Sequence, residues 1–301
     1  MIEAQFFKKT KDGRITCILC PRYCKLKPGQ RGFCFVRQHI NGSLFSLAYG
    51  KPYAVNVDPI EKKPLFHFLP GSRSYSIATA GCNFKCRFCQ NADISQMPHD
   101  QDQIWGEDMT PAMIVKDVLS SRSATIAYTY TEPTIYYELA LETSRLAVAK
   151  GIKNIFVSNG YMTEECLTDI YPDLHGANID LKAYNDKFYK DQCGAKLQPV
   201  LKTLETMKKM GVWLEVTTLL IPGLNDSKEE LKGLAKFLVD LDPDIPWHIS
   251  RFHPTYRLTD VPPTPPDSIH RASEIGYEAG LKYVYSGNIP GDKGEKTFCH
   301  G

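Results

Sequence analysis

Short apolar runs alternate with longer helical patterns from residue 75 to near the end of the chain. The short runs are rich in β-branched and aromatic residues, as strands are, and the segments between them repeat apolar residues at helical spacing. This alternation predicts an α/β fold with a parallel sheet whose strands are joined by crossover helices. The predicted strands are Tyr75–Ala80, Ala124–Tyr130, Asn154–Ser158, Ala177–Leu181, Val212–Leu220, Trp247–Phe252 and Lys282–Tyr285.

Helix-start signals support the segments between these strands. Thr110 precedes Pro111, the arrangement of an N-cap followed by a first-turn proline. Pro133 opens another apolar pattern, and Ser227 with Glu230 three residues later predicts a capping box. Six or seven βα units fit a full or partial TIM-like barrel, but an open Rossmann-type sheet has the same periodicity. The pattern alone leaves these two architectures open.

Residues 1 to about 70 lack this alternation. Their Pro, Gly and basic residues, with few long apolar runs, predict a small irregular module whose core is too thin to be stable alone. We therefore expect two domains, a Cys-rich N-terminal module at residues 1–70 and a barrel at residues 71–301.

Charge and hydropathy narrow the class of protein. The net charge is +2, so no basic field indicates nucleic acid or an anionic membrane as a partner. The first residues have no signal-peptide core, and no run approaches the ~20 apolar residues that span a bilayer. We expect a cytoplasmic protein.

Ten cysteines in a cytoplasmic chain indicate metal binding rather than disulfides, because that compartment keeps thiols reduced. Four of them, Cys17, Cys20, Cys24 and Cys34, are spaced C-x2-C-x3-C-x9-C in the N-terminal module. Four thiolates in one short segment predict a closed site, for either structural zinc or an auxiliary iron–sulfur cluster. The alternative is four unrelated free thiols.

A second group, Cys82, Cys86 and Cys89, has the spacing C-x3-C-x2-C directly after the first predicted strand. A cubane 4Fe-4S cluster usually takes four cysteines, so a compact three-Cys loop leaves one iron open to an outside ligand. The competing interpretation is a zinc knuckle with a fourth ligand elsewhere, such as His99 or Cys193.

The three-Cys loop resembles that of the radical S-adenosylmethionine (SAM) enzymes. The resemblance implies a partial (β/α)6 barrel with the chemistry at the C-terminal strand ends. It also implies that SAM chelates the open iron through its amino and carboxylate groups, and that Phe88 lies beside the adenine. The reduced cluster would pass one electron to the sulfonium, giving methionine and a 5'-deoxyadenosyl radical.

Two later segments resemble SAM-binding motifs of this family. Tyr130-Thr-Glu-Pro-Thr134 is similar to Gly-Gly-Glu-Pro, which implies that Glu132 contacts the SAM amino group, although Tyr130 and Thr131 replace the glycines. Ser158-Asn-Gly160 resembles Thr-Asn-Gly, which implies that Ser158 and Asn159 hydrogen bond the cofactor. A simple turn is the alternative for this second segment.

The fourth strand ends in Asn178-Ile-Asp-Leu-Lys182, similar to the Asp-Leu-Lys motif of the activating enzymes. Strand alternation places Asn178, Asp180 and Lys182 on one face, where buried polar groups need partners. A zwitterionic cofactor or substrate would supply such partners, so Asp180 and Lys182 are predicted catalytic residues, with Asp180 also binding cofactor. An internal salt bridge between them is the alternative.

The fifth and sixth strands end in two further candidates. Leu219-Leu-Ile-Pro-Gly-Leu-Asn-Asp226 resembles the family's Ile-Pro-Gly-x-Asn-Asp, which implies that Ile221 packs on the adenine. Trp247-His-Ile-Ser-Arg-Phe-His253 contains His248 and His253, of which one is expected to face the site. We assign His248 to cofactor binding and His253 to catalysis.

Across the whole chain, the sequence resembles the pyruvate formate-lyase activating enzymes and, more narrowly, the radical SAM member of the AmmeMemoRadiSam system. The narrower resemblance depends on the N-terminal cysteines, on the run from Asn56 to His67 and on Gly287-Asn-Ile-Pro-Gly-Asp292. The larger activases carry a Cys-rich insert with two extra clusters, which this chain lacks. Family sequences also tend to continue past a run like Thr297-Phe-Cys299 with another Cys, so the resemblance leads us to expect a C-terminal metal site of which this sequence carries only a part.

The resemblance implies a set of partners. They are a low-potential reductant such as flavodoxin or ferredoxin, a protein or small-molecule substrate, and proteins of the Memo and AMMECR1 families. The predicted function is hydrogen abstraction by a deoxyadenosyl radical from a protein glycine or a small molecule. The alternative is a non-catalytic zinc-binding barrel protein.

Overall fold

The structure is a computed structural model that describes residues 1–292, 294 and 296. In its described part, one sheet of eight strands has the order β14-β13-β12-β11-β10-β9-β8-β7. Strands β8 to β14 are parallel and neighbour one another in chain order, while β7 pairs antiparallel with β8. The strands are β7 (Pro52–Pro59), β8 (Arg73–Thr79), β9 (Thr125–Tyr128), β10 (Lys153–Ser158), β11 (Gly176–Asp180), β12 (Trp213–Leu220), β13 (Trp247–Arg251) and β14 (Val284–Gly287).

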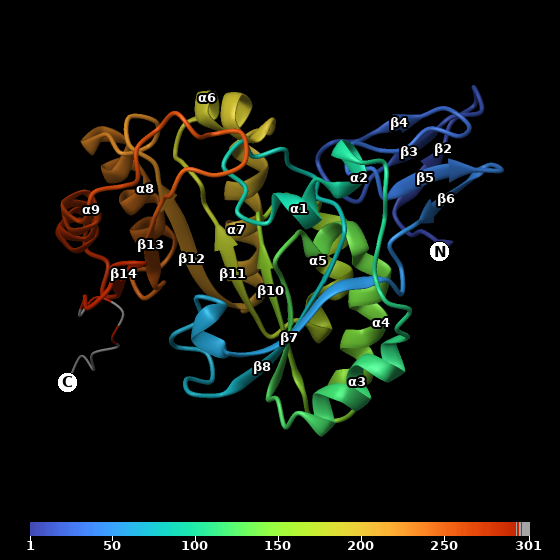
Figure 1. Cartoon of the computed structure of the whole chain (residues 1–301), viewed down its shortest axis with the longest axis horizontal. Coiled ribbons are helices and arrows are strands. Elements are labelled where there is room, and N and C mark those ends of the chain that lie inside the picture. Colours follow the sequence, from blue (N-terminus) through green and yellow to red (C-terminus); the bar gives the residue numbers. More distant parts are fainter. Residues whose placement is uncertain (293, 295, 297–301) are drawn as a thin grey trace.

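All the predicted strands are therefore confirmed, with ends that differ by two residues or fewer. Helices between the strands cover the outside of the curved sheet (Figure 1). Among the described residues, the edge strands β7 and β14 do not pair with each other, so the barrel is open. The predicted partial TIM-like barrel is confirmed.

The helical elements are short near the cysteine loop and longer around the barrel. The α-helices are α1 (Ala92–Ser95), α2 (Met97–Asp100), α3 (Pro111–Ser120), α4 (Tyr137–Val148), α5 (Glu164–Ile170), α6 (Asp186–Phe188), α7 (Gln198–Met210), α8 (Lys228–Leu241) and α9 (Pro266–Ala279). The other turns are η1 (Ile60–Lys62), η2 (Pro133–Tyr136), η3 (Tyr171–Asp173) and the π-helical η4 (Tyr189–Cys193).

The predicted helix starts are confirmed, but one capping prediction is half wrong. The Thr110 side chain accepts a hydrogen bond inside the first turn of α3, and Ser227 Oγ accepts one from Glu230 N at 3.2 Å. The Glu230 carboxylate does not return to Ser227. It accepts from Tyr184 N at 2.8 Å and Asn185 Nδ2 at 2.6 Å instead. The residue that would close the capping box thus anchors the loop after β11.

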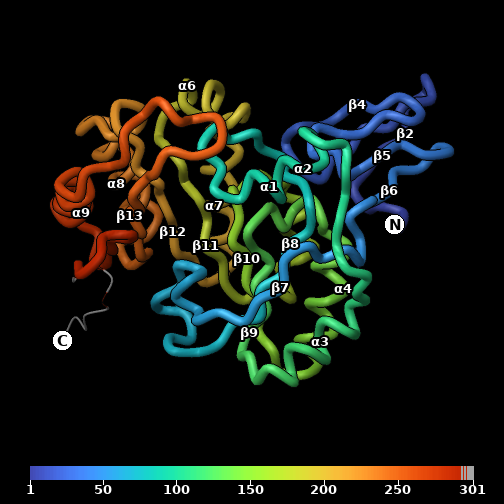
Figure 2. Tube along the Cα trace, in the orientation of Figure 1, coloured from blue at the N-terminus to red at the C-terminus, as the bar shows by residue number. Residues whose placement is uncertain are grey.

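The N-terminal cysteines lie in a module of two small antiparallel sheets in the described chain. One sheet has the order β1 (Ile2–Glu3), β6 (Ser43–Ser46), β5 (Arg37–Ile40), and the other β2 (Phe7–Lys9), β3 (Ile15–Cys17), β4 (Lys25–Leu26). The module lies on the opposite side of the molecule from α8 and α9 (Figure 2). Phe6 packs edge-on against Tyr137 of α4 at 5.1 Å, and Arg37 forms a buried ion pair with Glu138.

The segment between β7 and β8 folds back against the strands of the barrel. Glu215 of β12 accepts hydrogen bonds from Phe66 N and His67 N, both at 2.9 Å, and Asn178 Nδ2 of β11 donates to Pro64 O at 2.7 Å. The domain boundary near residue 70 stays a prediction. The strand β7 and the segment that follows it, although placed in the N-terminal module by that boundary, are hydrogen bonded within the barrel.

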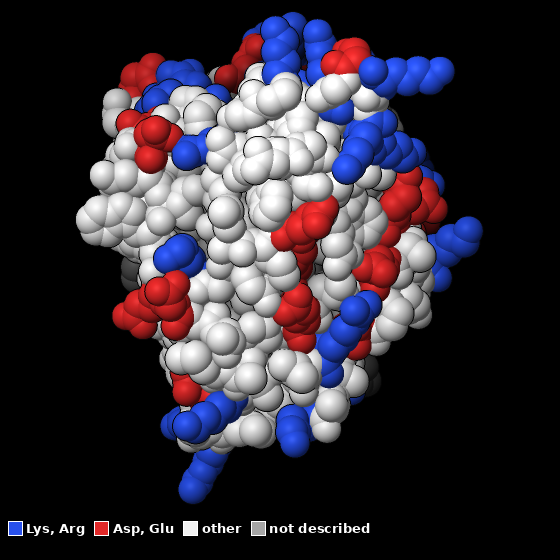
Figure 3. Space-filling model, turned by 90° about the vertical axis from the view of Figure 1, so that its right-hand side faces the viewer, with Lys and Arg blue, Asp and Glu red and all other residues white. Residues whose placement is uncertain are grey.

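The surface carries charge of both signs. Figure 3 shows one face on which acidic side chains lie mainly in the middle and basic side chains toward the upper and lower ends. Among the described helices, none is long and apolar enough to cross a membrane. The run Thr297-Phe-Cys299, where the resemblance implies part of a C-terminal metal site, lies outside the described residues.

Candidate active site

The loop that follows β8 carries Cys82, Cys86 and Cys89 to the C-terminal end of the sheet, where α1 also lies (Figure 1). Gly81 starts this loop with φ of 105°, and a Cβ there would lie 2.8 Å from Val36. A side chain at this position would therefore clash, and glycine is required both by the backbone and by the close approach of the module.

The three thiols share one cavity of about 320 Å³. Its walls come from residues at or just after the C-terminal ends of β8 to β13, and from the segment after β7. Besides the three cysteines, the lining residues that matter here are Lys62, Phe88, Asn91, Ser158, Asn159, Asp180, Lys182, Thr217, Leu219 and Ser250. Chemistry at the C-terminal strand ends is what a barrel of this kind provides.

Donor groups near the sulfur atoms suit bound thiolates. Phe84 N donates to Cys82 Sγ at 3.3 Å, and Asn159 Nδ2 approaches the same sulfur at 3.7 Å. Ser95 Oγ lies 3.2 Å from Cys89 Sγ. Hydrogen bonds to cysteine sulfurs are one of the means by which proteins hold and tune iron–sulfur clusters. The donor set therefore fits a cluster with three protein thiolates.

The loop is clamped by the π-helical turn η4. Lys85 N donates to Cys193 O at 3.0 Å, and Arg87 N donates to Gln192 O at 2.9 Å. The buried Cys193 thiol hydrogen bonds to Cys86, which lowers the pKa of Cys86, whereas burial raises the pKa of Cys82. The turn thus fixes the backbone on both sides of the middle cysteine.

The zinc interpretation finds no support in this geometry. Among the described residues, no three His, Cys, Asp or Glu side chains meet closely enough to hold one metal ion. His99, one proposed fourth ligand, lies with Nε2 2.5 Å from Lys85 Nζ and Nδ1 3.0 Å from Asp100 Oδ1. Cysteines that bind different irons of one cluster stand farther apart than the ligands of a single ion.

Glu132 lies behind the cavity rather than on its wall. Its side chain is 0% exposed and accepts from Thr134 N at 3.0 Å, Ser158 Oγ at 2.8 Å and Asn159 N at 2.9 Å. Burial raises the pKa of Glu132, and these hydrogen bonds oppose that rise. The direct contact of Glu132 with the SAM amino group stays a prediction. In the structure, Glu132 instead positions Ser158 and Asn159 through hydrogen bonds.

The departure from the Gly-Gly-Glu-Pro pattern has a structural counterpart. Tyr130 stands where the family has glycine, and its φ of 59° lies in the left-handed region that favours glycine. Its hydroxyl donates to Asp58 Oδ2 at 2.6 Å, and its carbonyl accepts from Asn91 Nδ2 at 2.8 Å. The backbone therefore keeps the glycine-like conformation, stabilised by contacts to β7 and to the cysteine loop.

Asp180 and Lys182 both reach the cavity and form an ion pair with each other at 2.8 Å. Burial alone would lower the pKa of Lys182, but the carboxylate of Asp180 beside it outweighs burial and raises that pKa. The ion pair thus favours the charged form of Lys182 beside the cysteine loop. Asn178, on the same strand face, lies deeper and binds the segment after β7.

Three predicted site residues lie elsewhere. The described residues around the cavity do not include Ile221, His248 or His253. Ile221 is buried behind the loop that follows β12, and His253 is exposed beyond β13. His248 lies near the start of β13, whereas the cavity lies at the C-terminal ends of the strands. Its Nε2 contacts Glu215 Oε2 at 2.7 Å.

Sequence reasoning missed several wall residues. Strand alternation places Ser250 on the same face as His248 and two residues closer to the C-terminal end of β13, so this pattern could have identified it. Thr217 of β12 was open to the same argument. No local sequence pattern predicted Lys62 as a wall residue, because it belongs to the segment after β7, outside the repeating βα pattern.

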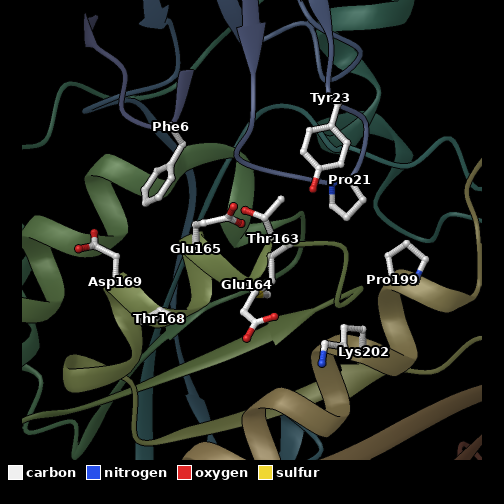
Figure 4. A pocket seen from close by; sticks show the side chains of 11 residues that line it. Phe6, Pro21, Tyr23, Thr163, Glu164, Glu165, Thr168, Asp169, Pro199 and Lys202 are labelled. Carbon is white, nitrogen blue, oxygen red and sulfur yellow. The ribbon is translucent and has the colours of Figure 1, made fainter. Parts of the chain in front are cut away.

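A larger cavity of about 940 Å³ lies between the module and helices α5 and α7. Figure 4 shows Phe6 and Tyr23 of the module on one side, with Glu164 and Glu165 of α5 near them. The described residues around it include no cysteine. Size alone therefore does not identify the active site, and the smaller cavity contains the reactive groups.

Comparison with known proteins agrees with this site. Residues 76–238, which include the three-Cys loop, match the radical SAM superfamily. The chain is 47% identical over 300 residues to an uncharacterized protein of Methanocaldococcus jannaschii, covering 99% of this chain and 89% of that protein. It is 23% identical over 175 residues to the pyruvate formate-lyase-activating enzyme of Clostridium pasteurianum, covering 57% of this chain and 71% of that enzyme.

The fold has solved counterparts as well. A radical SAM methyltransferase from Sphaerobacter thermophilus superposes with a TM-score of 0.58 at 16% identity, covering 73% of this chain and 67% of that one. The chain therefore belongs to the radical SAM superfamily. It is an enzyme of radical SAM type, similar in sequence to pyruvate formate-lyase-activating enzymes, and this family implies a 4Fe-4S cluster and SAM as cofactors.

Proposed function

We propose that Cys82, Cys86 and Cys89 bind the 4Fe-4S cluster and that the enzyme uses it to abstract hydrogen from a protein or small-molecule substrate. The observation that supports this most is the shared cavity, which joins three thiols to polar side chains from successive strand ends. When bound, the reduced cluster supplies one electron to the SAM sulfonium and yields methionine and a 5'-deoxyadenosyl radical.

The side chains around the cavity suggest how SAM is held. Phe88 is buried against Phe188 at 5.6 Å and offers an apolar surface for the adenine. Asn159 and Ser158 present polar groups that are oriented by Glu132, and Lys182 offers a cation to the SAM carboxylate. Asp180 holds Lys182 in place and can accept hydrogen bonds from the ribose or the amino group.

We assign the substrate to the side of the cavity formed by β12 and β13. The cysteine loop and the β10 end occupy the opposite side, so Thr217 and Ser250 remain as polar groups that the cofactor does not need. Lys62, from the segment after β7, borders the same cavity and has a side chain that is 69% exposed. This arrangement favours a polar substrate group that approaches past Lys62.

The resemblance supports further proposals about context. They are membership of the AmmeMemoRadiSam system with Memo-family and AMMECR1-family partners, a reductant such as flavodoxin or ferredoxin, and zinc or a second cluster at the N-terminal cysteines. The motifs quoted from residues 56–67 and 287–292 support the system membership.

The test of the proposed function is reductive SAM cleavage by anaerobically reconstituted protein. Replacing Cys82, Cys86 or Cys89 with Ala should reduce 5'-deoxyadenosine formation to background, because the cluster loses one of three protein thiolates. Cys166→Ala is the matched control, since Cys166 is a buried cysteine that does not line this cavity. Near wild-type product from any of the three variants would refute the cluster assignment.

The substrate can be identified in the same assay. Candidate proteins and metabolites are supplied in deuterated form, and the 5'-deoxyadenosine is analysed by mass spectrometry. Deuterium in the product identifies the molecule whose hydrogen is abstracted. SAM cleavage without deuterium transfer from any candidate excludes those candidates as donors and leaves the cluster assignment intact.

A further inference from the structure

The cysteine loop of the active site has an inner face and an outer face. Phe84, Cys86 and Phe88 line the cavity and form the inner face. Lys85 and Arg87, which alternate with them along the chain, are absent from the described lining of the cavity. Arg87 is exposed and Lys85 is half-buried. Consecutive Cα atoms are about 3.8 Å apart, so a molecule bound to the outer face lies close to the Cys86 thiol.

Two arginines from distant segments extend the positive charge of this outer face. Arg257 N donates to Arg87 O at 2.9 Å, and Arg87 Nη2 donates to Arg257 O at 3.2 Å, so the two residues lie side by side. The Arg22 guanidinium lies 3.6 Å from the centre of the Phe33 ring, and Lys85 Nζ lies 4.7 Å from the same centre. We call these four cations, Arg22, Lys85, Arg87 and Arg257, the basic surface.

The carboxylates near the basic surface do not neutralise it. Asp100 Oδ1 lies 3.0 Å from Arg257 Nη2, and the same carboxylate accepts from Tyr256 Oη at 2.7 Å. On the adjoining turn η4, Asp191 is paired with Lys187 at 2.8 Å. The other three cations of the basic surface form no ion pair within the part of the chain that the structure describes. Positive charges gathered in this way repel one another, and an anionic partner would relieve that repulsion.

This excess of charge is local rather than a property of the whole protein. The chain has a net charge of only +2 over 301 residues. The Arg257 side chain is 56% exposed, so its charge can meet a partner from solution. A cationic surface attracts an anionic partner over a distance and speeds their association. The basic surface therefore fits a molecule whose contact area is negatively charged.

The proposed reaction indicates what such a partner does. Reductive cleavage of SAM consumes one electron, which a donor outside the chain must supply. The inner face of the loop is assigned to SAM and the substrate, so the outer face is the side left for the donor. The shortest approach from that face to the Cys86 thiol is through the loop backbone between Lys85 and Arg87.

We propose that the basic surface is the docking site of a protein electron donor that carries carboxylates around its redox group. The inference rests on the proposed function, because the surface has an electron acceptor behind it only if Cys86 binds the cluster. In the transfer step the donor loses one electron and the SAM-cleaving site gains it, with no bond or proton moved. The cations of the basic surface act by binding and orienting the donor.

The test compares two reductants on the double variant Arg87→Gln with Arg257→Gln. With reduced flavodoxin as the donor, the KM for flavodoxin in 5'-deoxyadenosine formation should rise roughly 10-fold or more at low salt. With reduced methyl viologen, a small cation that gains nothing from a basic surface, the rate should match wild type, because neither arginine lines the cavity. Equal losses with both reductants would assign the arginines to support of the cysteine loop and overturn the docking site.

The matched control is Arg122→Gln with Arg271→Gln, which removes the same charge at two exposed positions, before β9 and on α9. This variant should keep the wild-type KM for flavodoxin. An equal rise of that KM in both double variants would show that net charge, rather than the basic surface, attracts the donor. Wild-type protein that cleaves SAM with neither reductant would refute the proposed function and the docking site with it.

Direct binding gives a readout that does not depend on activity. Isothermal titration calorimetry should show that wild-type protein binds oxidised flavodoxin, more weakly as salt is raised, and that Arg87→Gln with Arg257→Gln binds it roughly 10-fold or more weakly. Unchanged affinity in this variant would contradict the proposal. Binding of a single-stranded oligonucleotide instead of flavodoxin, lost in the same variant, would assign the basic surface to nucleic acid and overturn the proposal as well.

Discussion

Glu132 illustrates how a single buried carboxylate can organise a binding surface without forming part of it. Each of its oxygens accepts from groups of the β10 end or of the turn before α4, and its side chain is inaccessible to solvent. The residues that it orients, Ser158 and Asn159, do line the cavity. Its effect on SAM is therefore expected to pass through them.

Glu132→Gln should weaken both folding and SAM binding. The amide has one acceptor oxygen and places an NH2 donor against groups that already donate, so charge-assisted hydrogen bonds worth roughly 1.5–3 kcal/mol are lost. The measurements are chemical denaturation and SAM affinity with the cluster intact. Glu164→Gln, at an exposed position on α5, is the control. Unchanged SAM affinity in a destabilised Glu132 variant would show that Ser158 and Asn159 are not cofactor ligands.

Asp180→Asn and Lys182→Met should each reduce turnover while keeping the iron. Both residues line the cavity, and neither is a thiolate ligand. Removing one member of the pair leaves the other charge without its partner, which also lowers stability. The measurement is 5'-deoxyadenosine formation at saturating SAM, alongside iron content. Full activity with earlier thermal unfolding in both variants would identify the pair as a structural salt bridge.

At the scale of elements, the segment from η1 to β8 determines the shape of the barrel interior. Glu215 of β12 binds two backbone amides of this segment, and it also accepts from Trp213 Nε1 at 3.1 Å and lies 2.7 Å from His248 Nε2. These contacts hold Lys62 and Pro64 at the cavity wall. They also hold His248 against Glu215, away from the residues that line the cavity.

Glu215→Gln should lower the free energy of unfolding by roughly 1.5–3 kcal/mol near neutral pH. Burial would raise the pKa of Glu215, but the hydrogen bonds from His248, Phe66 and His67 outweigh burial and lower it. Because the folded pKa lies below the unfolded value, the stabilisation is present above the unfolded pKa and is lost as pH falls through the folded pKa.

The difference in the free energy of unfolding between wild type and Glu215→Gln should therefore shrink as the pH is lowered below about 4.3, the ordinary pKa of glutamate. Urea denaturation at several pH values measures it. Glu205→Gln, at an exposed position on α7, should show no such pH-dependent difference. A stability difference that is constant across this pH range would mean that the Glu215 carboxylate is not the stabilising group.

At the scale of the whole molecule, the N-terminal module and the barrel form one unit through buried contacts. The ion pair of Arg37 and Glu138 has side chains that are each 2% exposed, and it joins β5 to α4. Thr163 Oγ1, at the start of α5, donates to Ile18 O at 2.9 Å, which adds a further link to the module. We expect the two parts to unfold together.

Arg37→Met should destabilise the whole chain by about 3–5 kcal/mol, because it leaves the buried Glu138 charge unpaired. Adding Glu138→Gln should recover a large part of this loss, since it removes the unpaired charge. Calorimetry of the metal-loaded protein should show one transition in wild type and in both variants. Two separate transitions in wild type would show that the module and the barrel unfold independently.

The sequence by itself determined those features of the protein that depend on the pattern of neighbouring residues. The parallel strands, the helix starts at Thr110 and Ser227 and the position of the cysteine loop after β8 follow from periodicity and spacing, which neighbouring residues specify. Asp180 and Lys182 were predicted to share a strand face, and both reach the cavity. These features need no knowledge of which distant segments meet.

Only the tertiary structure decided which side chains face the cavity and which support it. Glu132 faces Ser158 across 26 positions, His248 is held by Glu215, and Arg37 meets Glu138 across 101 positions. Long-range packing also explains why Glu230 does not close the predicted capping box. Its carboxylate accepts hydrogen bonds from donors in the loop after β11, which are distant in sequence but near in space. Local pattern identifies the polar residues at strand ends, but long-range packing sets their direction and their partners.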